Sequence, residues 1–211
     1  MRFVAISDTH AQHNSVRLPK GDVLLHAGDI THRGREEEVQ QFFKWFSLLP
    51  FRYKIFIGGN HDFFLEKNKK HFPSMVPDGI TYLNDSGIEV EGIRIWGSPV
   101  IPWFYNWAFN VPRGQSIRRH WERIPQNTDI LITHGPPYGI LDQVITGRHV
   151  GCRDLGEVVE RIRPGIHLFG HIHESFGSVT KNGTRYINAS QMNETYQLVN
   201  KPVVFELKSQ S

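Results

Sequence analysis

The sequence contains a set of side chains whose types suit metal binding: Asp8, His10, Asp29, Asn60, His134, His171 and His173. Two carboxylates, one amide and four imidazoles are too many ligands for one tetrahedral ion, and they suit two ions of higher coordination number with water between them. Two cations ~3.5–4 Å apart can hold a phosphoryl group, polarise its oxygens and lower the pKa of a bridging water. The set therefore predicts a metal-dependent phosphoesterase.

These candidate ligands follow short apolar runs that are typical of buried strands: 3–6, 23–27, 53–57, 129–133 and 166–169. Side chains at one end of neighbouring strands converge on a crevice in an α/β sheet. The i, i+2 spacing of Asp8 with His10, and of His171 with His173, points both members of each pair the same way on an extended strand tip. Adjacent glycines permit tight turns that bring the side chains close: Gly28, Gly58, Gly59, Gly135 and Gly170.

Other chemistries lack their sequence signatures. Cys152 is the only cysteine, which excludes an intramolecular disulfide and a cage of thiolate ligands. The sequence has no GxxxxGK[ST] motif of a phosphate-transferring NTPase and no GxSxG nucleophile motif. We interpret His26, which lies within a predicted strand, as a core residue with satisfied hydrogen bonds. A metal centre of nitrogen and oxygen ligands is the chemistry that the sequence favours.

Strands and helices that would position these residues can be predicted along the chain. Apolar residues at helical spacing predict an amphipathic helix over 35–49, and similar patterns predict helices over 63–71, 117–124 and 155–162. Three short strand-like pieces suggest a meander over 81–83, 88–90 and 94–97. Asn182-Gly183 suits the turn of a late hairpin, 176–180 with 184–188, and 203–207 is a closing strand. The aromatic segment 102–109 shows no clear period.

The composition predicts one folded domain over residues 1–211. The chain has 39% hydrophobic and 12% aromatic residues, enough to bury a full core. No continuous apolar stretch is long enough to cross a membrane, and the N-terminus lacks a secretory pattern, so we expect a cytoplasmic protein. The net charge is +3 and the basic residues are scattered, which fits an anionic substrate but not a nucleic-acid-binding surface.

Five motifs resemble the signature blocks of the calcineurin-like metallophosphoesterases: DTH, GDITHRG, GNHD, THGPP and GHIH, in that order from Asp8 to His173. A closer similarity, to metallophosphoesterase-domain proteins of vertebrate brain and their bacterial relatives, extends through PWFYNWAFNVPRGQS, DILITHGPP and INAS…NKPVVFEL. The resemblance implies a four-layer α/β/β/α sandwich, in which two mixed sheets pack back to back between helices and the metal site lies at the strand ends.

The resemblance also implies residue roles. The first metal would be held by Asp8, His10, Asp29 and His173, and the second by Asp29, Asn60, His134 and His171. His61 would be the general acid that protonates the leaving oxygen, and Asp62 would keep its imidazole oriented and cationic. The nucleophile would be a metal-bound hydroxide. Mn²⁺ is the expected metal, with Fe or Zn²⁺ as alternatives, because all three accept nitrogen and oxygen ligands.

The expected substrate is a small phosphodiester or nucleotide, with 2′,3′- and 3′,5′-cyclic nucleotides as examples. Two loop pairs could contact its phosphate, His32 with Arg33 and Arg148 with His149. The aromatic segment could stack a nucleobase or serve as core or lid. Alternatives are a nucleotide-binding regulator or interaction module of low activity, and a phosphomonoesterase or protein phosphatase. Some vertebrate members of the closer subfamily have glycine at the position of His171, and the histidine here favours a competent enzyme.

Overall fold

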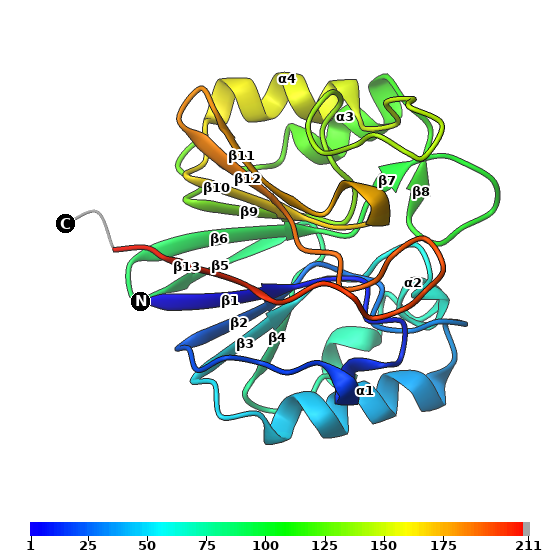
Figure 1. Cartoon of the computed structure of the whole chain (residues 1–211), viewed down its shortest axis with the longest axis vertical. Helices are drawn as coiled ribbons and strands as arrows, with labels where there is room; N and C mark the ends of the chain where they lie inside the picture. Colours follow the sequence, from blue (N-terminus) through cyan, green and yellow to red (C-terminus); the bar gives the residue numbers. More distant parts are fainter. Residues whose placement is uncertain (209–211) are drawn as a thin grey trace.

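Two β-sheets pack face to face between helices in the computed structural model, which describes residues 1–208 (Figure 1). The first sheet has the strand order β13 (Val203–Glu206), β1 (Arg2–Ile6), β2 (Val23–His26), β3 (Tyr53–Phe56) and β4 (Ile80–Tyr82). The second has the order β11 (Gly177–Lys181), β12 (Thr184–Asn188), β10 (Ile166–Phe169), β9 (Ile130–Thr133), β6 (Ile93–Ser98) and β5 (Ser86–Val90). The predicted α/β sandwich of two mixed sheets flanked by helices is confirmed.

Parallel pairing in the middle of each sheet brings the ligand-bearing loops to one end of the sandwich. β1, β2 and β3 run parallel in the first sheet, and β9 and β10 run parallel in the second. The sheets are joined at this end where Ser7, just after β1, donates its backbone N–H to the carbonyl oxygen of Ala189, just after β12 (2.9 Å). The carboxyl ends of strands from both sheets therefore surround one region.

Three hydrophobic clusters hold the layers together. Alternate residues of β1 face opposite sides, so Phe3 and Ala5 enter the core between the sheets while Val4 and Ile6 face the outer layer. Helix α1 (Glu36–Leu48) covers the first sheet with Val39, Phe42 and Phe46, the apolar stripe that its sequence period predicted. Helices α3 (Gln115–Trp121) and α4 (Arg153–Ile162) cover the second sheet. The order is helix, sheet, sheet, helix (Figure 1).

The predicted meander over 81–97 is wrong in one respect. β4 pairs in parallel with β3 in the first sheet, whereas β5 and β6 form an antiparallel hairpin in the second. The chain crosses between the sheets at Asp85, whose φ of 47° turns it sharply. The predicted helix over 63–71 is also shorter, because α2 spans only Phe63–Lys67 and a 3₁₀ turn, η2 (Phe72–Met75), follows.

The late hairpin is confirmed. β11 and β12 are joined by Asn182 (φ 52°) and Gly183 (φ 86°), the positive angles of a tight two-residue turn. The aromatic segment 102–109 connects two short strands that pair in parallel, β7 (Ile101–Pro102) and β8 (Asn110–Val111). Short 3₁₀ turns complete the elements, η1 (His13–Ser15) and η3 (His173–Ser175).

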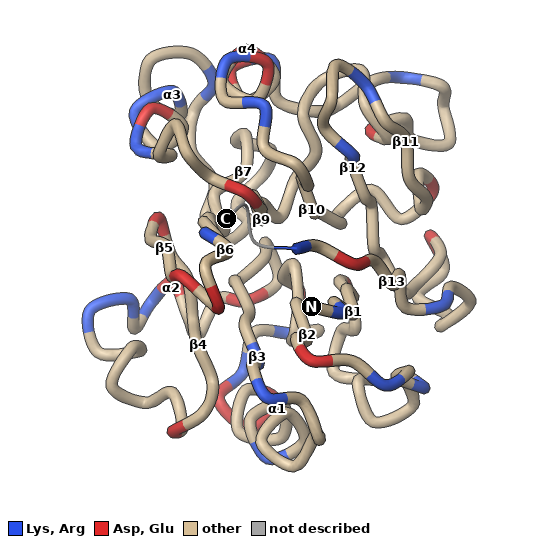
Figure 2. The backbone as a smooth tube through the Cα atoms, turned by 90° about the vertical axis from the view of Figure 1, so that its left-hand side faces the viewer, with Lys and Arg blue, Asp and Glu red and all other residues tan. Residues whose placement is uncertain are grey.

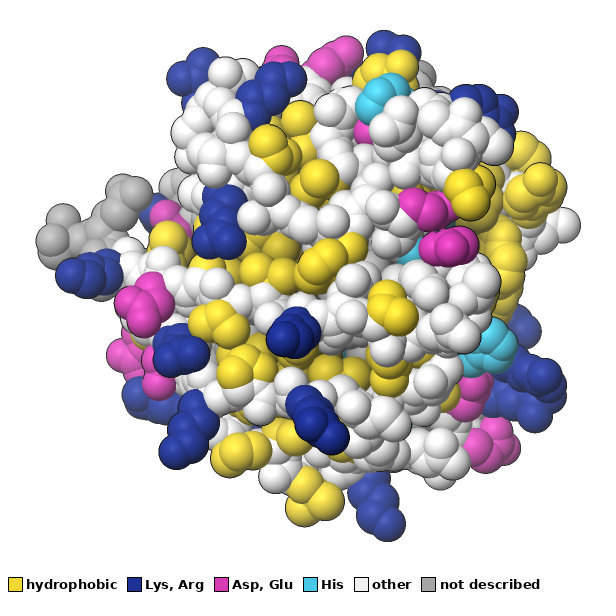
Figure 3. Space-filling view, in the orientation of Figure 1, with side chains coloured by type: hydrophobic (Ala, Val, Ile, Leu, Met, Phe, Trp, Pro, Cys, Tyr) yellow, Lys and Arg dark blue, Asp and Glu magenta, His cyan; other side chains and the backbone are white. Residues whose placement is uncertain are grey.

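Charged side chains of both signs are distributed over the whole chain. Figure 2 shows Lys and Arg positions next to Asp and Glu positions along the backbone, and Figure 3 shows both signs on one face. This distribution agrees with the small net charge of +3 and gives no single-sign surface on the face drawn. Within residues 1–208, no helix combines the length and the apolar character that a membrane crossing requires.

Candidate metal centre

The loops after five parallel strands bring the predicted ligands together. Asp8 and His10 follow β1, Asp29 follows β2, Asn60 follows β3, His134 follows β9, and His171 and His173 follow β10. Asp8, Asp29 and His134 are almost fully buried. The pairs are not extended strand tips, because Asp8, His10 and His171 have φ angles of 52°, 39° and 67°. Backbone in this sparsely populated region is typical of functional sites, where surrounding structure holds the strain.

Ligand atoms converge in two overlapping groups. In one, His10 Nε2 lies 3.4 Å from His173 Nε2, and His173 Nε2 lies 3.5 Å from Asp8 Oδ1. In the other, His134 Nε2 lies 3.4 Å from Asp29 Oδ2 and 2.8 Å from Asn60 Oδ1.

Asp29 joins the groups, because its Oδ2 is also 3.7 Å from His10 Nε2. The His171 ring lies 5.1 Å from the His134 ring, so His171 and His173 face different groups.

Two of the histidine rings, those of His134 and His173, are each oriented by a backbone carbonyl behind Nδ1. His134 Nδ1 lies 2.9 Å from the carbonyl oxygen of Ala27, and His173 Nδ1 lies 2.9 Å from that of Asn193. Each Nδ1–H donates to its carbonyl, so each Nε2 can be a ligand. This arrangement of a backbone acceptor behind the ring is typical of metal-binding histidines. The donor set of imidazole nitrogens, carboxylates and an amide oxygen fits divalent cations such as Mn²⁺, Fe and Zn²⁺.

The two buried carboxylates, Asp8 and Asp29, control the protonation of the histidines around them. Burial lowers the pKa of a histidine, yet the charge of Asp29 outweighs it and raises the pKa of His134 to about 9. Burial is likewise outweighed by Asp8 at His173, whose pKa is raised to about 9. At His10 and His171 burial dominates and lowers the pKa to about 4 and about 3. Despite burial, the neighbouring histidines hold the pKa values of Asp8 and Asp29 below the usual range. Two ionised carboxylates inside the protein favour a bound cation.

Two glycines allow this close approach. A Cβ at Gly170 would overlap the carboxylate of Asp8, and a Cβ at Gly59 would overlap both the carboxylate and the backbone nitrogen of Asp29. Any larger residue at either position would displace a candidate ligand. The sequence prediction that glycines permit close packing of the ligands is confirmed at these two positions.

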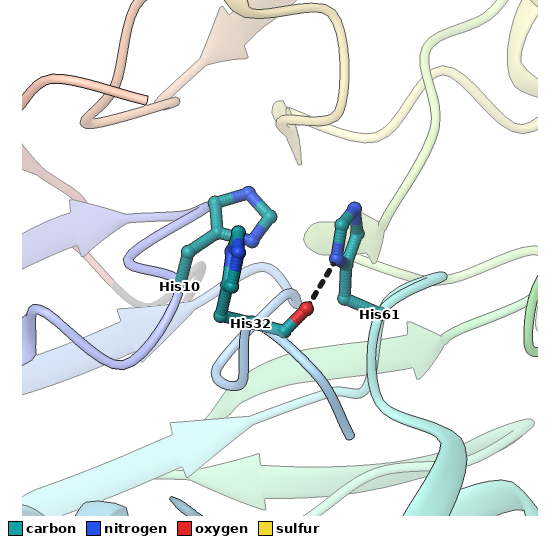
Figure 4. A group of neighbouring side chains, drawn as sticks. All are labelled: His10, His32 and His61. Carbon is teal, nitrogen blue, oxygen red and sulfur yellow. Dashed lines mark hydrogen bonds between the residues drawn. The ribbon is translucent and has the colours of Figure 1, made fainter. Parts of the chain in front are cut away.

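His61 stands beside the two groups with its outer nitrogen free. Its Nδ1–H donates to the carbonyl oxygen of His32 (2.8 Å), as Figure 4 shows, and its ring lies 4.6 Å from the ring of His10. His61 lines the same site, and its second ring nitrogen can carry a proton to a bound group. The backbone N–H of His61 also donates to Asp29 Oδ1 (2.8 Å), which ties the loop after β3 to a candidate ligand.

The predicted role of Asp62 as the partner of the His61 ring is wrong. The Asp62 carboxylate instead accepts hydrogen bonds from the backbone of Gly59, Ile30 and Thr31 and from the Thr31 hydroxyl, at 2.6–3.2 Å. Burial and the charge of Asp29 raise the pKa of Asp62 to about 7. Asp62 therefore fixes the loops that carry Asp29 and Asn60, and the His32 carbonyl orients the His61 ring.

We predict that Asp62→Ala lowers the free energy of unfolding by about 3 kcal/mol, because several buried donors lose their acceptor. Urea denaturation of the variant measures the loss. Asp62→Asn keeps one acceptor oxygen and should lose less, and Asp78→Ala, at an exposed position, is the matched control. An Asp62→Ala protein as stable as the wild type would show that the carboxylate has no structural role.

The chain is similar to known proteins in sequence and in fold. The calcineurin-like phosphoesterase family profile matches residues 1–175. The chain belongs to the calcineurin-like phosphoesterase family.

Metallophosphoesterase domain-containing protein 1 of Homo sapiens is 44% identical to this chain. The match covers 98% of this chain and 71% of that protein. UPF0046 protein K07C11.7 of Caenorhabditis elegans is 37% identical, over 97% of this chain and 74% of the relative. TT1561 of Thermus thermophilus shares the fold (TM-score 0.60, 12% identity, 89% of this chain and 88% of that chain).

A pocket of about 230 Å³ opens onto the candidate metal centre of this phosphoesterase-family chain. Predicted site residues line part of it: Asp29, Asn60, His61, His171 and His173. Phe104, Trp107, Glu174, Glu194 and Tyr196 complete its wall. The aromatic segment thus contributes to the site through two of its rings. Sequence reasoning missed the last three residues, although Glu174 directly follows the GHIH motif and could have been noticed there.

Of the four residues predicted to contact the phosphate, only His32 lies next to the candidate metal centre. His32 lies next to the centre, with its ring 6.0 Å from those of His10 and His61 (Figure 4). Arg33 lines a separate pocket with Arg35, Glu37, Glu38 and Gln41. His149 Nδ1 bonds to Asp142 (2.6 Å), and Arg148 bonds to the Thr146 hydroxyl in the same loop. The structure brings neither these two nor Arg33 into the wall of the pocket.

Proposed function

We propose that this protein hydrolyses small phosphodiesters with two divalent cations held by Asp8, His10, Asp29, Asn60, His134, His171 and His173. The observation that supports the proposal most strongly is the position of Asp29, whose Oδ2 lies 3.4 Å from His134 Nε2 and 3.7 Å from His10 Nε2. Such a carboxylate can be shared between two cations. All seven positions carry residues able to bind metals, which favours an enzyme over a regulator that has lost a ligand.

The protein groups would divide the work of the reaction. When bound, the cations supply Lewis-acid polarisation of the phosphoryl oxygens and lower the pKa of water. His61, which lines the pocket and is oriented by the His32 carbonyl, donates the proton that the departing oxygen needs. Asp29 accepts the His61 backbone N–H and so keeps the acid at a fixed distance from the centre.

The charge of the pocket favours a diester over a monoester. Among the residues that line the pocket there is no Lys or Arg, and Glu174 and Glu194 lie at its rim. A phosphomonoester carries ≈ −1.5 to −2 charge near pH 7, whereas a diester carries one charge. Glutamates at the rim repel the more highly charged group. Cyclic nucleotides remain candidate substrates, since the aromatic rings of Phe104, Trp107 and Tyr196 can stack on a base.

Turnover of matched substrates tests the proposal. Protein freed of metal with a chelator and then supplied with Mn²⁺, Zn²⁺ or Fe²⁺ is assayed with bis-p-nitrophenyl phosphate, p-nitrophenyl phosphate and the 2′,3′- and 3′,5′-cyclic nucleotides. We expect no turnover without metal, and with metal a higher kcat/KM for the diester than for the monoester. Equal or faster cleavage of the monoester would favour the phosphomonoesterase alternative. Absence of turnover in a protein that contains two metals would favour the regulator.

A further inference from the structure

Aromatic rings form two walls of the pocket at the candidate metal centre. On one wall, the Trp107 ring lies 4.5 Å from the His61 ring and 6.4 Å from the Phe104 ring, and Phe104 lies 5.3 Å from His171. On the other wall, the Tyr196 ring lies 4.9 Å from His10 and 5.5 Å from His173. Tyr196 remains 38% exposed, so its ring has a face available to a ligand.

Two carboxylates are fixed next to the Tyr196 wall. Glu174 directly follows His173, and Glu194 directly follows Asn193, whose carbonyl oxygen accepts the His173 Nδ1–H bond (2.9 Å). A single hydrogen bond therefore positions the segments that carry both glutamates. The Asn193 side chain accepts bonds from the backbone of Thr195 and Gln197, which stabilises the turn that carries Glu194 and Tyr196.

In the part of the chain that the structure describes, neither carboxylate forms an ion pair with a Lys or Arg side chain. Glu174 Oε1 accepts only a backbone bond, from Ile145 N (3.2 Å). Within residues 1–208, the ion pairs of Lys and Arg involve other acids, namely Asp85, Glu91, Asp129, Asp154 and Glu157. Both glutamates are exposed and line the pocket. The rim thus combines negative charge with aromatic faces.

This combination suits a positively charged group. The face of an aromatic ring is negative, and cations with apolar surface, such as quaternary ammonium groups, bind against Trp, Tyr and Phe. A nucleobase would use the rings but has no positive charge to pair with two carboxylates. A second phosphate would be repelled by them. An ammonium group uses both features of the rim.

We propose that Glu174, Glu194, Tyr196, Trp107 and Phe104 form a subsite for the ammonium group of a zwitterionic phosphodiester, such as an ester of choline phosphate. The inference rests on the proposed function, because it places the phosphate of the same molecule at the metal centre. A substrate of this class has one negative phosphate and one positive ammonium group, and so carries no net charge. In the test reaction water adds to phosphorus, the P–O bond to nitrophenol breaks, and nitrophenol and choline phosphate are released.

A pair of substrates of the same shape isolates the charge. p-Nitrophenyl phosphorylcholine is compared with p-nitrophenyl 3,3-dimethylbutyl phosphate, in which carbon replaces the quaternary nitrogen. We expect kcat/KM to be about ten-fold higher for the choline ester. In the double variant Glu174→Gln with Glu194→Gln, this ratio should fall, because only the aromatic faces then favour the cation. Glutamine keeps the acceptor for Ile145 N, so the fold of the loop is preserved. Glu89→Gln, on the distant strand β5, should leave the ratio as in the wild type.

The outcomes separate the inference from the proposed function. If the wild type cleaves both esters equally well, or if the preference of the double variant is as large as that of the wild type, the subsite assignment is overturned while the hydrolase remains. If the metal-loaded protein cleaves neither ester, the proposed function fails, and calorimetric titration with choline and with 3,3-dimethylbutanol decides the inference. Tighter binding of choline that depends on the two glutamates supports the subsite, and equal or undetectable binding of choline refutes it.

Discussion

The Asp29→Ala variant should lose its bound metal ions and its turnover together. Asp29 Oδ2 lies 3.4 Å from His134 Nε2 and 3.7 Å from His10 Nε2, so its removal takes one ligand from each of the two groups. Because bound metal ions supply several kcal/mol of transition-state stabilisation, kcat/KM should fall by roughly 10³-fold or more. Metal content by mass spectrometry and turnover of bis-p-nitrophenyl phosphate are the measurements.

Asp78→Ala is the matched control for this prediction, since Asp78 is an exposed aspartate in the turn before β4. It should keep the metal content and the turnover of the wild type. Circular dichroism of Asp29→Ala separates a lost site from a lost fold. Turnover at the wild-type rate in a folded Asp29→Ala protein would rule out a shared carboxylate at the centre of the mechanism.

The His61→Ala variant should keep its metals and slow only those reactions whose leaving group needs a proton. The His61 backbone N–H, which bonds to Asp29 Oδ1, is retained in the variant, so the ligand groups keep this contact. Loss of a general acid typically costs ~10²–10⁴-fold in rate. We expect that loss with alkyl esters and cyclic nucleotides, and a much smaller one with nitrophenyl esters, because nitrophenolate departs without protonation.

The rates of a series of diesters with leaving groups of increasing pKa measure this effect. The slope of log kcat against leaving-group pKa should be steeper for His61→Ala than for the wild type. His71→Ala, at an exposed histidine ten residues along the chain, should reproduce the wild-type slope. Parallel slopes for wild type and His61→Ala would mean that another group delivers the proton.

The candidate ligands were predictable because the signal is local. An apolar run followed at once by Asp, Asn or His specifies both the strand and the residue at its carboxyl end. Parallel pairing of β1, β2 and β3 then brings Asp8, Asp29 and Asn60 together, and His134 reaches them from β9 of the second sheet. The same reasoning gave the helix of Val39, Phe42 and Phe46 and the turn at Asn182-Gly183. Each of these depends on neighbours within a few residues.

Contacts between distant loops were not predictable in this way. The sequence suggests the wrong partner for the His61 ring because the distance from Nδ1 to the His32 carbonyl depends on how two loops pack, and Asp62 is adjacent only in sequence. Glu194 and Tyr196 reach the site through the segment after β12, which crosses from one sheet to the other and carries no periodic pattern. The pairing of β4 with β3 likewise depends on the turn at Asp85.

Anomalous diffraction from crystals of the protein grown with Mn²⁺ tests the central claim most directly. Two separate anomalous peaks should appear, one among Asp8, His10 and His173 and one among Asn60, His134 and His171, both within coordination distance of an Asp29 oxygen. A single peak, or peaks that do not contact Asp29, would contradict the two-metal site on which the proposed phosphodiester hydrolysis depends.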